Sequence, residues 1–300
     1  MTIWTLNLGP DKAPLALTDW PRVMGILNLT PDSFSDGGRF ADPGAAIEHA
    51  HRMIAEGAEL LDLGAESTRP GGGVYGSGAP ELSADEEWLR LAPVLPRLRA
   101  ELPGAILSID TRKAEVARRA LAEGADLVND VGGLRDAAMA DTVAAARCPL
   151  ILMHSRGELR TMQQDIHFGD VVAEVAAELA DLAAKALAAG VRREQIVLDP
   201  GIGFGKKLQH NLALLARLDE MGELAGGYPL LVGASRKSFV DKISPAPPSE
   251  RLGGSLAAAA AAAQGGAAIL RVHDVAATVQ FLRVLWAIDR AARVASPDAM

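Results

Sequence analysis

Two acidic side chains and one amide follow buried apolar runs and could together bind a ligand rich in hydrogen-bond donors. Asp110 ends the run AILSID, Asn129 lies in DLVND, and Asp199 ends IVLD. Buried carboxylates are costly unless a cation or donors meet them. A planar heterocycle with an amino group beside a ring N–H supplies two adjacent donors, and one carboxylate can accept both. We therefore expect these three side chains to hold an amino-heterocycle at the bottom of one pocket.

Basic side chains that follow other apolar runs could bind a phosphate group on the same ligand. This set consists of Arg69, Lys237, Arg271 and His273. Asn28, after the first run, offers a neutral oxygen that would suit Mg²⁺, an ion that prefers oxygen ligands and keeps several waters. The residues alone thus predict an amino-heterocycle that carries a phosphate group, which could leave.

Each of these residues also has a simpler interpretation. Asp110, in SIDTRK, could cap the N-terminus of a helix, and Asp199, in LDPG, could open a turn. Lys237 could be a solvated loop lysine or a Schiff-base lysine. The segment PGIGFGKK (200–207) looks like a phosphate-binding loop, but Pro200 and Lys207 break the required spacing.

The elements that must position these residues are read from alternating apolar runs and helical segments. Four helical segments end in a Gly-containing phrase (EGAE, EGAD, AAGV and QGGA) before the next run begins. Strands that alternate with helices pair in parallel, and eight of them predict a (β/α)8 TIM barrel. An open doubly wound sheet is the alternative, but no glycine-rich nucleotide fingerprint follows the first run. The apolar runs are 23–27, 60–64, 105–110, 126–130, 150–153, 196–199, 230–234 and 268–272.

The barrel prediction places the polar residues on one face. In this fold, catalytic groups lie at the C-terminal strand ends and in the loops that follow them, which is where the candidate residues fall. We expect one domain over residues 1–300, with an N-terminal β-hairpin (1–21) closing the barrel bottom, the barrel itself (22–290) and a short tail (291–300).

Composition excludes several classes of function. The net charge is −8 and no basic tract occurs, so nucleic acid is not an expected partner. No signal peptide and no uncharged run of 18 apolar residues is present, which predicts a cytoplasmic protein without a membrane partner. The lone cysteine, Cys148, fits a reducing compartment.

Taken together, the motifs resemble those of the dihydropteroate synthase family. The phrases are MGILNLTPDSFSDGG, GAESTRPG, SIDTRK, LVNDVGG, LMHSRG, LDPGIGFGK, LLVGASRKSF and RVHDV, and they extend from Val23 to Asp274. The likeness covers nearly the whole predicted barrel. Two phrases depart from common family patterns: Ala65 precedes Glu66, and residues 154–157 read HSRG.

The resemblance implies a reaction and a set of roles. The amine of p-aminobenzoate would displace pyrophosphate from 6-hydroxymethyl-7,8-dihydropterin diphosphate, in folate biosynthesis. Asp110 and Lys237, with Asn28 and Arg69, would be the catalytic residues, and Asn28 would contact Mg²⁺. The pterin would be held by Asp110, Asn129, Asp199 and Lys237, and the diphosphate by Asn28, Arg271 and His273. The p-aminobenzoate site would consist of Thr68, Arg69, Pro70, Phe204 and Ser235.

The resemblance also implies a homodimer and a sulfonamide target. Alternatives stay open at this point. A pterin-binding methyltransferase would share the barrel and the Asp/Asn pocket but would not need Asn28, Arg69 or the SRK phrase. A non-catalytic pterin-binding protein, or an aldolase with a Schiff base on Lys237, is also possible in principle.

Overall fold

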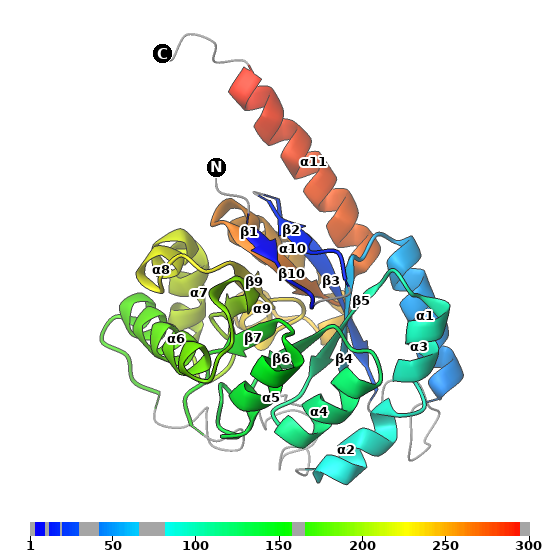
Figure 1. Cartoon of the computed structure of the whole chain (residues 1–300). Coiled ribbons are helices and arrows are strands. Elements are labelled where there is room, and N and C mark those ends of the chain that lie inside the picture. The colour runs from blue at the N-terminus through cyan, green and yellow to red at the C-terminus, as the bar shows by residue number, and fades with distance from the viewer. Residues whose placement is uncertain are drawn as a thin grey trace.

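Eight parallel strands close into a barrel in the computed structural model (Figure 1). The structure describes residues 4–9, 12–18, 20–29, 42–65, 82–157 and 166–294. The sheet order is β10-β3-β4-β5-β6-β7-β8-β9, and β10 pairs with β3 to close it. The predicted (β/α)8 barrel is therefore confirmed, and the open sheet is wrong. The strands are β3 (Arg22–Asn28), β4 (Leu60–Gly64), β5 (Ile106–Asp110), β6 (Leu127–Asp130), β7 (Leu150–Met153), β8 (Ile196–Asp199), β9 (Leu230–Val232) and β10 (Ala267–Val272).

Helices follow the strands and cover the outside of the barrel (Figure 1). Several begin at a side-chain cap: Asp42 accepts from the Gly44 amide, and Ser83 and Glu86 form a capping box. Two short 3₁₀ segments, Arg193–Gln195 and Pro248–Glu250, lie before β8 and before α10. The helices are α1 (Pro43–Ala55), α2 (Ala84–Leu91), α3 (Leu95–Glu101), α4 (Ala114–Ala122), α5 (Met139–Ala146), α6 (Val171–Ala188), α7 (Leu208–Ala216), α8 (Leu218–Leu224), α9 (Ser238–Ile243), α10 (Leu252–Gln264) and α11 (Val275–Val294).

The glycine phrases seen in the sequence do end helices. The backbone at these glycines has a positive φ of 81° to 104°, which favours glycine over other residues. A left-handed residue at this point turns the chain back toward the barrel, and the next strand starts within a few residues. The glycines are Gly57, Gly124, Gly190 and Gly266.

The barrel interior has an apolar lower half and a polar upper half. The lower half is a layer of buried side chains from seven of the strands, listed last in this paragraph. Two residues further along the strands, where side chains return to the same face, Asp62, Ser108 and Asn129 take their place. The carboxyl ends of the strands therefore surround a buried polar centre. The lower layer is Met24, Leu60, Leu127, Ile151, Val197, Leu231 and Ile269.

The N-terminal segment forms the expected hairpin and packs against that lower layer. Strands β1 (Trp4–Leu6) and β2 (Leu15–Leu17) pair in antiparallel fashion. Leu6, Leu8 and Leu17 are buried in the same cluster as the lower layer of the barrel. The hairpin thus closes the N-terminal end of the barrel and leaves the opposite end for the site.

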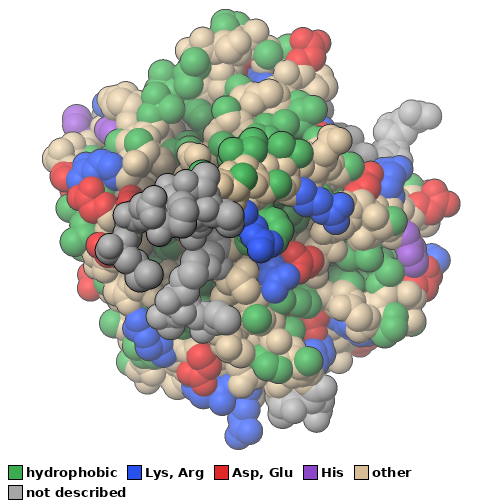
Figure 2. All heavy atoms as spheres, turned by 90° about the horizontal axis from the view of Figure 1, so that it is seen from above, with side chains coloured by type: hydrophobic (Ala, Val, Ile, Leu, Met, Phe, Trp, Pro, Cys, Tyr) green, Lys and Arg blue, Asp and Glu red, His purple; other side chains and the backbone are tan. Residues whose placement is uncertain are grey.

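The outer surface mixes charges of both signs. Figure 2 shows basic and acidic side chains scattered among hydrophobic ones on one face. Many of the described charges are paired on single helices, as in Arg118 with Glu115 at 2.8 Å and Arg217 with Glu220 at 2.6 Å. Such exposed pairs contribute little to stability because water screens them. Within the described ranges, no helix combines the length and the apolar character needed to cross a bilayer.

Candidate active site

The strand pairing brings the predicted acidic and amide residues together at the C-terminal end of the barrel. Asp110 pairs in register with Asn129 and, on its other side, with Gly64. Asp110 and Asn129 are both buried, and Asp199 is 6% exposed at the end of β8. Arg271, on β10, reaches across the barrel to this group. The structure therefore places four of the predicted residues around one centre.

Asp62 lies at the middle of this centre, and the sequence analysis missed it. Its carboxylate, which is 0% exposed, accepts from Arg271 Nε at 2.5 Å, Asn129 Nδ2 at 3.1 Å and Ser108 Oγ at 2.5 Å. The available signal was the run LLDLG, in which a single aspartate interrupts an apolar strand. Alternation places Asp62 on the same face as Leu60, which is inside the barrel.

Two buried acceptor atoms in this centre have no partner among the described residues: Asp110 Oδ1 and Asn129 Oδ1. The other oxygen of Asp110 accepts from Arg271 Nη2 at 2.7 Å. Buried acceptors without donors are unfavourable, so this pair is suited to a ligand that brings N–H groups.

Burial raises the pKa of Asp110 to about 7. Arg271 opposes the shift, and the nearby carboxylate of Asp62 adds to it. One guanidinium serves both carboxylates, and Asp62 also has Ser108 and Asn129 as donors. Asp110 is therefore the carboxylate that gains most from a new donor.

Lys237 comes from the loop after β9 and lies against the loop after β8. Its ammonium donates to the carbonyl of Ile202 and lies 4.4 Å from the centre of the Phe204 ring. Burial lowers the pKa of Lys237 to about 8, with Asp199 opposing the shift. Burial likewise raises the pKa of Asp199, with Lys237 opposing. The two groups stabilise each other's charged forms at the pocket edge.

The loops after β9 and β10 are tied to each other. Ser235 Oγ lies 3.1 Å from His273 Nδ1. Arg236 pairs with Asp274 through two hydrogen bonds of 2.9 and 2.5 Å, and its amide donates to Ser255 Oγ. These contacts set the positions of the residues on either side of them.

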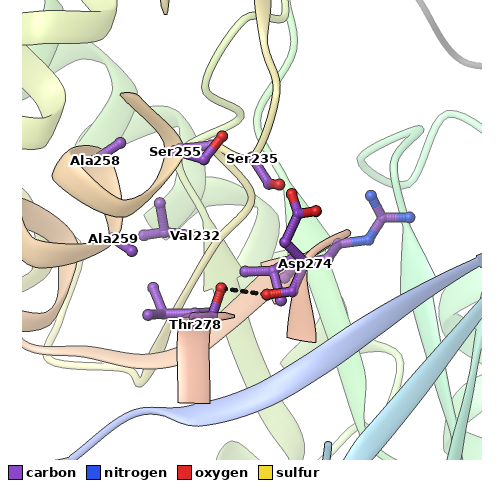
Figure 3. A pocket seen from close by; sticks show the side chains of 11 residues that line it. Val232, Ser235, Ser255, Ala258, Ala259, Asp274 and Thr278 are labelled. Carbon is purple, nitrogen blue, oxygen red and sulfur yellow. Dashed lines mark hydrogen bonds between the residues drawn. The ribbon is translucent and has the colours of Figure 1, made fainter. Parts of the chain in front are cut away.

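A cavity of about 10 Å³, with room for about one water molecule, lies behind this tie rather than in the site (Figure 3). Its lining comes from β9, β10, α10 and the start of α11. In Figure 3, Ser235 and Asp274 lie on one side of the cavity and the alanines of α10 on the other.

Asn28, the predicted metal contact, ends β3 and pairs in register with Gly64. Among the described residues, no group of three or more His, Cys, Asp or Glu side chains could hold a metal ion. A single amide oxygen suits Mg²⁺ only where substrate phosphates and water supply the remaining ligands. Three further predicted residues, Thr68, Arg69 and Pro70, lie outside the described part of the chain.

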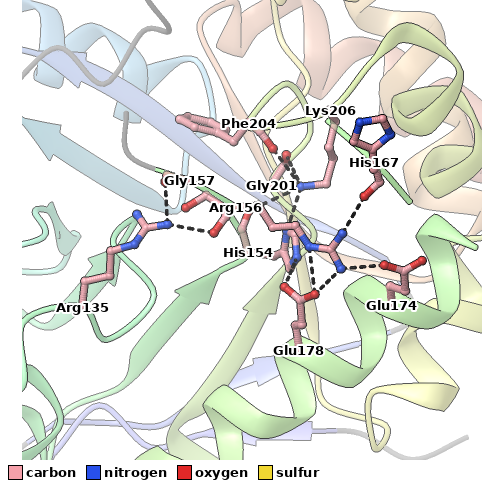
Figure 4. A network of polar contacts seen from close by, with 11 residues as sticks. Arg135, His154, Arg156, Gly157, His167, Glu174, Glu178, Gly201, Phe204 and Lys206 are labelled. Carbon is pink, nitrogen blue, oxygen red and sulfur yellow. Dashed lines mark hydrogen bonds and ion pairs between the residues drawn. The ribbon is translucent and has the colours of Figure 1, made fainter. Parts of the chain in front are cut away.

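A second polar network lies behind the loops after β7 and β8 (Figure 4). Lys206 is 2% exposed, and its ammonium lies 2.9 Å from His154 Nδ1. His154 Nε2 is 3.0 Å from Glu178, which also pairs with Arg156. Arg156 continues the network to Glu174 at 2.7 Å. Sequence reasoning passed over Lys206 because its neighbours GIGFG pointed only to a failed phosphate loop.

Known proteins resemble this chain over most of its length. A family model described as pterin binding enzyme matches residues 24–273. A dihydropteroate synthase of Synechocystis sp. is 46% identical over 288 residues, which is 94% of this chain and 96% of the relative.

Solved structures give the same picture. The dihydropteroate synthase of Xanthomonas albilineans with 4-aminobenzoic acid matches with a TM-score of 0.85 and 44% identity, over 96% of this chain and 99% of that one. The enzyme from Yersinia pestis, in a sulfonamide drug complex, matches with a TM-score of 0.86 and 40% identity over the same shares. These matches agree with the strand order and the C-terminal placement of the polar centre.

Proposed function

The chain belongs to the dihydropteroate synthase family of pterin-binding enzymes, and we propose that the polar centre of its barrel carries out the family's transfer reaction. The amine nitrogen of p-aminobenzoate attacks the methylene carbon of 6-hydroxymethyl-7,8-dihydropterin diphosphate. A C–N bond forms, the C–O bond to the diphosphate breaks, and the amine loses a proton. The products are dihydropteroate and pyrophosphate, so the enzyme is a transferase of folate biosynthesis.

The observation that carries the proposal is the pair of unpartnered acceptors, Asp110 Oδ1 and Asn129 Oδ1. The amino group and ring N–H groups of a pterin supply the donors that these atoms lack. Asp199 and Lys237, at the edge of the same centre, add an acceptor and a donor for the rest of the ring. Ionised Asp110 also stabilises positive charge that develops on the pterin methylene as the diphosphate leaves.

The diphosphate lies toward the loops after β3 and β10 in this proposal. Arg271 and His273 bind its oxygens, and Arg271 also stacks on the pterin. Mg²⁺, held through Asn28 and the diphosphate itself, would stabilise the charge on the leaving group. Arg69, outside the described residues, is proposed to act on the same charge.

The p-aminobenzoate site lies between the loops after β8 and β9. Phe204 and Ser235 form its described part, and Thr68, Arg69 and Pro70 complete it from the loop after β4. No covalent nucleophile is needed. Lys237 donates to a backbone carbonyl, which suits an ion that binds substrate better than a Schiff-base amine. Relatives that are synthases by name favour this function over the methyltransferase and the non-catalytic pterin-binding protein.

A direct assay tests the function. The purified protein is incubated with dihydropterin diphosphate, p-aminobenzoate and Mg²⁺, and released pyrophosphate is measured with and without the amine. Amine-dependent release that EDTA abolishes and a sulfonamide inhibits competitively supports the proposal. Pyrophosphate release that ignores p-aminobenzoate, or none at all, contradicts it.

The organisation beyond the site is also proposed. We propose one domain over residues 1–300, a homodimer and a cytoplasmic location, on the strength of the single barrel and the family likeness. Sedimentation of the purified chain at several concentrations measures the dimer, and a monomer at all of them would exclude it.

A further inference from the structure

The segment 200–207, PGIGFGKK, resembles a phosphate-binding loop in sequence, yet its first lysine points inward. The Lys206 ammonium donates to the carbonyls of Phe204 at 3.0 Å and Gly201 at 3.1 Å, and it lies 2.9 Å from His154 Nδ1 (Figure 4). An ammonium has three N–H donors, and three acceptors surround this one. The loop therefore wraps around its own cation instead of around an anion.

The backbone of the loop is shaped for this arrangement. Gly201, Gly203 and Gly205 all have positive φ, of 65°, 87° and 59°, in alternation with Ile202 and Phe204. A side chain at Gly201 would bring its Cβ to 1.9 Å from the His154 carbonyl oxygen, so only glycine fits there. The alternation turns the carbonyls of Gly201 and Phe204 toward the ammonium.

The carbonyl between them serves the site. Ile202 is buried, and its carbonyl accepts from Lys237. The ring of Phe204 packs with Val131 and Met153 and lies 4.4 Å from the same ammonium of Lys237. One short loop thus has Lys206 on its inner side and Lys237 on its outer side.

The support for Lys206 extends outward to the helix α6. Since Lys206 can only donate in its charged form, His154 Nδ1 must accept, and His154 Nε2–H then donates to Glu178 at 3.0 Å. Burial and the neighbouring Lys206 lower the pKa of His154 to about 4, which keeps this ring neutral. Glu178 is itself held by Arg156, so the network fixes the loop after β8 against the loop after β7.

We infer that Lys206 is a positioning residue for the transfer reaction: its buried ammonium orders the loop 200–205 and so holds the Ile202 carbonyl and the Phe204 ring against Lys237. This inference rests on the proposed function, because it assigns Phe204 and Lys237 to the substrate pocket. The role is one of geometry, since Lys206 contacts no group that reacts.

The test compares Lys206→Met with Lys207→Met, the same change at the exposed neighbour. Lys206→Met removes the ammonium and keeps most of the side-chain volume. Misplacing a binding group by about 1 Å can cost about 10²-fold, so we expect kcat/KM for p-aminobenzoate to fall by about that factor. Most of the fall should appear as a higher KM for p-aminobenzoate, because Phe204 is in that site. The Lys207→Met control should stay within about twofold of the wild type.

A double-mutant cycle separates positioning from general destabilisation. If Lys206 acts through Phe204, Lys206→Met costs much less in a Phe204→Leu background than in the wild type. Hydrogen exchange of peptides that cover 200–205 should be faster in Lys206→Met and unchanged in Lys207→Met. Additive effects in the cycle, or unchanged kcat/KM in a folded Lys206→Met protein, overturn the inference.

Two further readouts keep the test decisive. If Lys206→Met does not fold, Glu178→Gln weakens the same network from its half-exposed end, and a rise in the p-aminobenzoate KM is again expected; an unchanged KM counts against the inference. Failure of the proposed function is distinguishable, since wild-type protein would then release no pyrophosphate, and hydrogen exchange of 200–205 would still report whether Lys206 orders the loop.

Discussion

Asp110 is the residue whose charge state decides what the pocket can bind. Its Oδ1 has no partner among the described residues, and burial raises its pKa to about 7. A ligand that brings N–H donors needs the ionised carboxylate, since a protonated one offers a donor of its own. Near neutral pH, binding of such a ligand is therefore coupled to loss of a proton from Asp110.

The first prediction follows from that coupling. As pH falls below about 7, Asp110 becomes protonated in the free enzyme, and the Kd of 7,8-dihydropteroate should rise by about tenfold per pH unit. Calorimetry between pH 5.5 and 8.5 in two buffers of different ionisation enthalpy measures the Kd and the proton release. Asp110→Asn should bind more weakly and lose the slope. A wild-type Kd that is flat across this range would contradict the role of Asp110.

Asp62 gives a second prediction, because it orients two of its neighbours. It can only accept, so Asn129 must turn Nδ2 toward it and leave Oδ1 for the ligand. Asp62→Asn offers an amide that can donate, which allows Asn129 to flip and leaves Arg271 Nε poorly paired. We expect dihydropteroate affinity to fall by about 1–3 kcal/mol, roughly 5- to 150-fold.

Ser108→Ala is the matched control for Asp62→Asn, because it removes one donor to Asp62 and leaves the other two. Its effect on the same Kd should be several-fold smaller. Equal losses in the two variants would show that Asp62 matters as a buried charge and not as an orienting group.

At the scale of elements, the site depends on loops that hold one another. The loop after β9 carries Ser235 and Lys237, and the loop after β10 carries His273. Arg236 lies between them with a positive φ of 58°, a conformation that is uncommon for arginine, and it is held there by Asp274 and Ser255. Strain of this kind persists when surrounding contacts fix the backbone.

The third prediction removes that contact. Arg236→Met abolishes both hydrogen bonds to Asp274 and should let Ser235 shift away from His273, so the KM for p-aminobenzoate should rise by about tenfold or more. Steady-state kinetics with saturating pterin substrate gives the KM. Arg217→Met, which loses an exposed helical pair, is the control and should leave the KM unchanged. A similar KM in both variants would remove Arg236 from the account.

The elements were largely predictable from the sequence, while the contacts between them were not. Each strand is an apolar run after a glycine that ends a helix, and both signals are local. Asp110, Asn129 and Asp199 were predictable because strand ends share one face of the barrel. Asp62 was missed because one aspartate inside LLDLG carries no motif. Lys206 was missed because only the folded loop reveals that its backbone carbonyls converge on the side chain.

Across the whole molecule, the two ends of the barrel have different tasks. The hairpin and the lower layer are apolar and provide stability, whereas the upper half buries Asp62, Asp110, Asp199 and Lys206. Buried charges lower the free energy of unfolding unless they are fully paired. The polar centre therefore binds substrate at the expense of stability, and this trade-off can be measured at Asp110.

The last prediction is that Asp110→Asn makes the protein more stable at pH 8 while it weakens ligand binding. In the unfolded chain an aspartate has a pKa of about 3.9. Because the folded pKa is raised to about 7, the folded state binds more protons between these values, and stability falls as pH rises through that window. Above about pH 7 the full destabilisation is present in the wild type, and asparagine removes it. We expect a gain on the order of 2 kcal/mol at pH 8, or roughly 4 °C in Tm, that shrinks toward zero near pH 4.

Thermal unfolding of both proteins from pH 4.5 to 8.5, without ligand, measures the difference between them and cancels the effects of other titrating groups. The difference must grow with pH, because that sign follows from a raised carboxylate pKa; a difference that shrinks with pH would mean that Arg271 stabilises ionised Asp110 by more than its burial costs. A fixed gain at every pH would instead point to packing. In either case the ion pair at the centre of the barrel, and not the demand for a donor ligand, would explain why Asp110 is buried there.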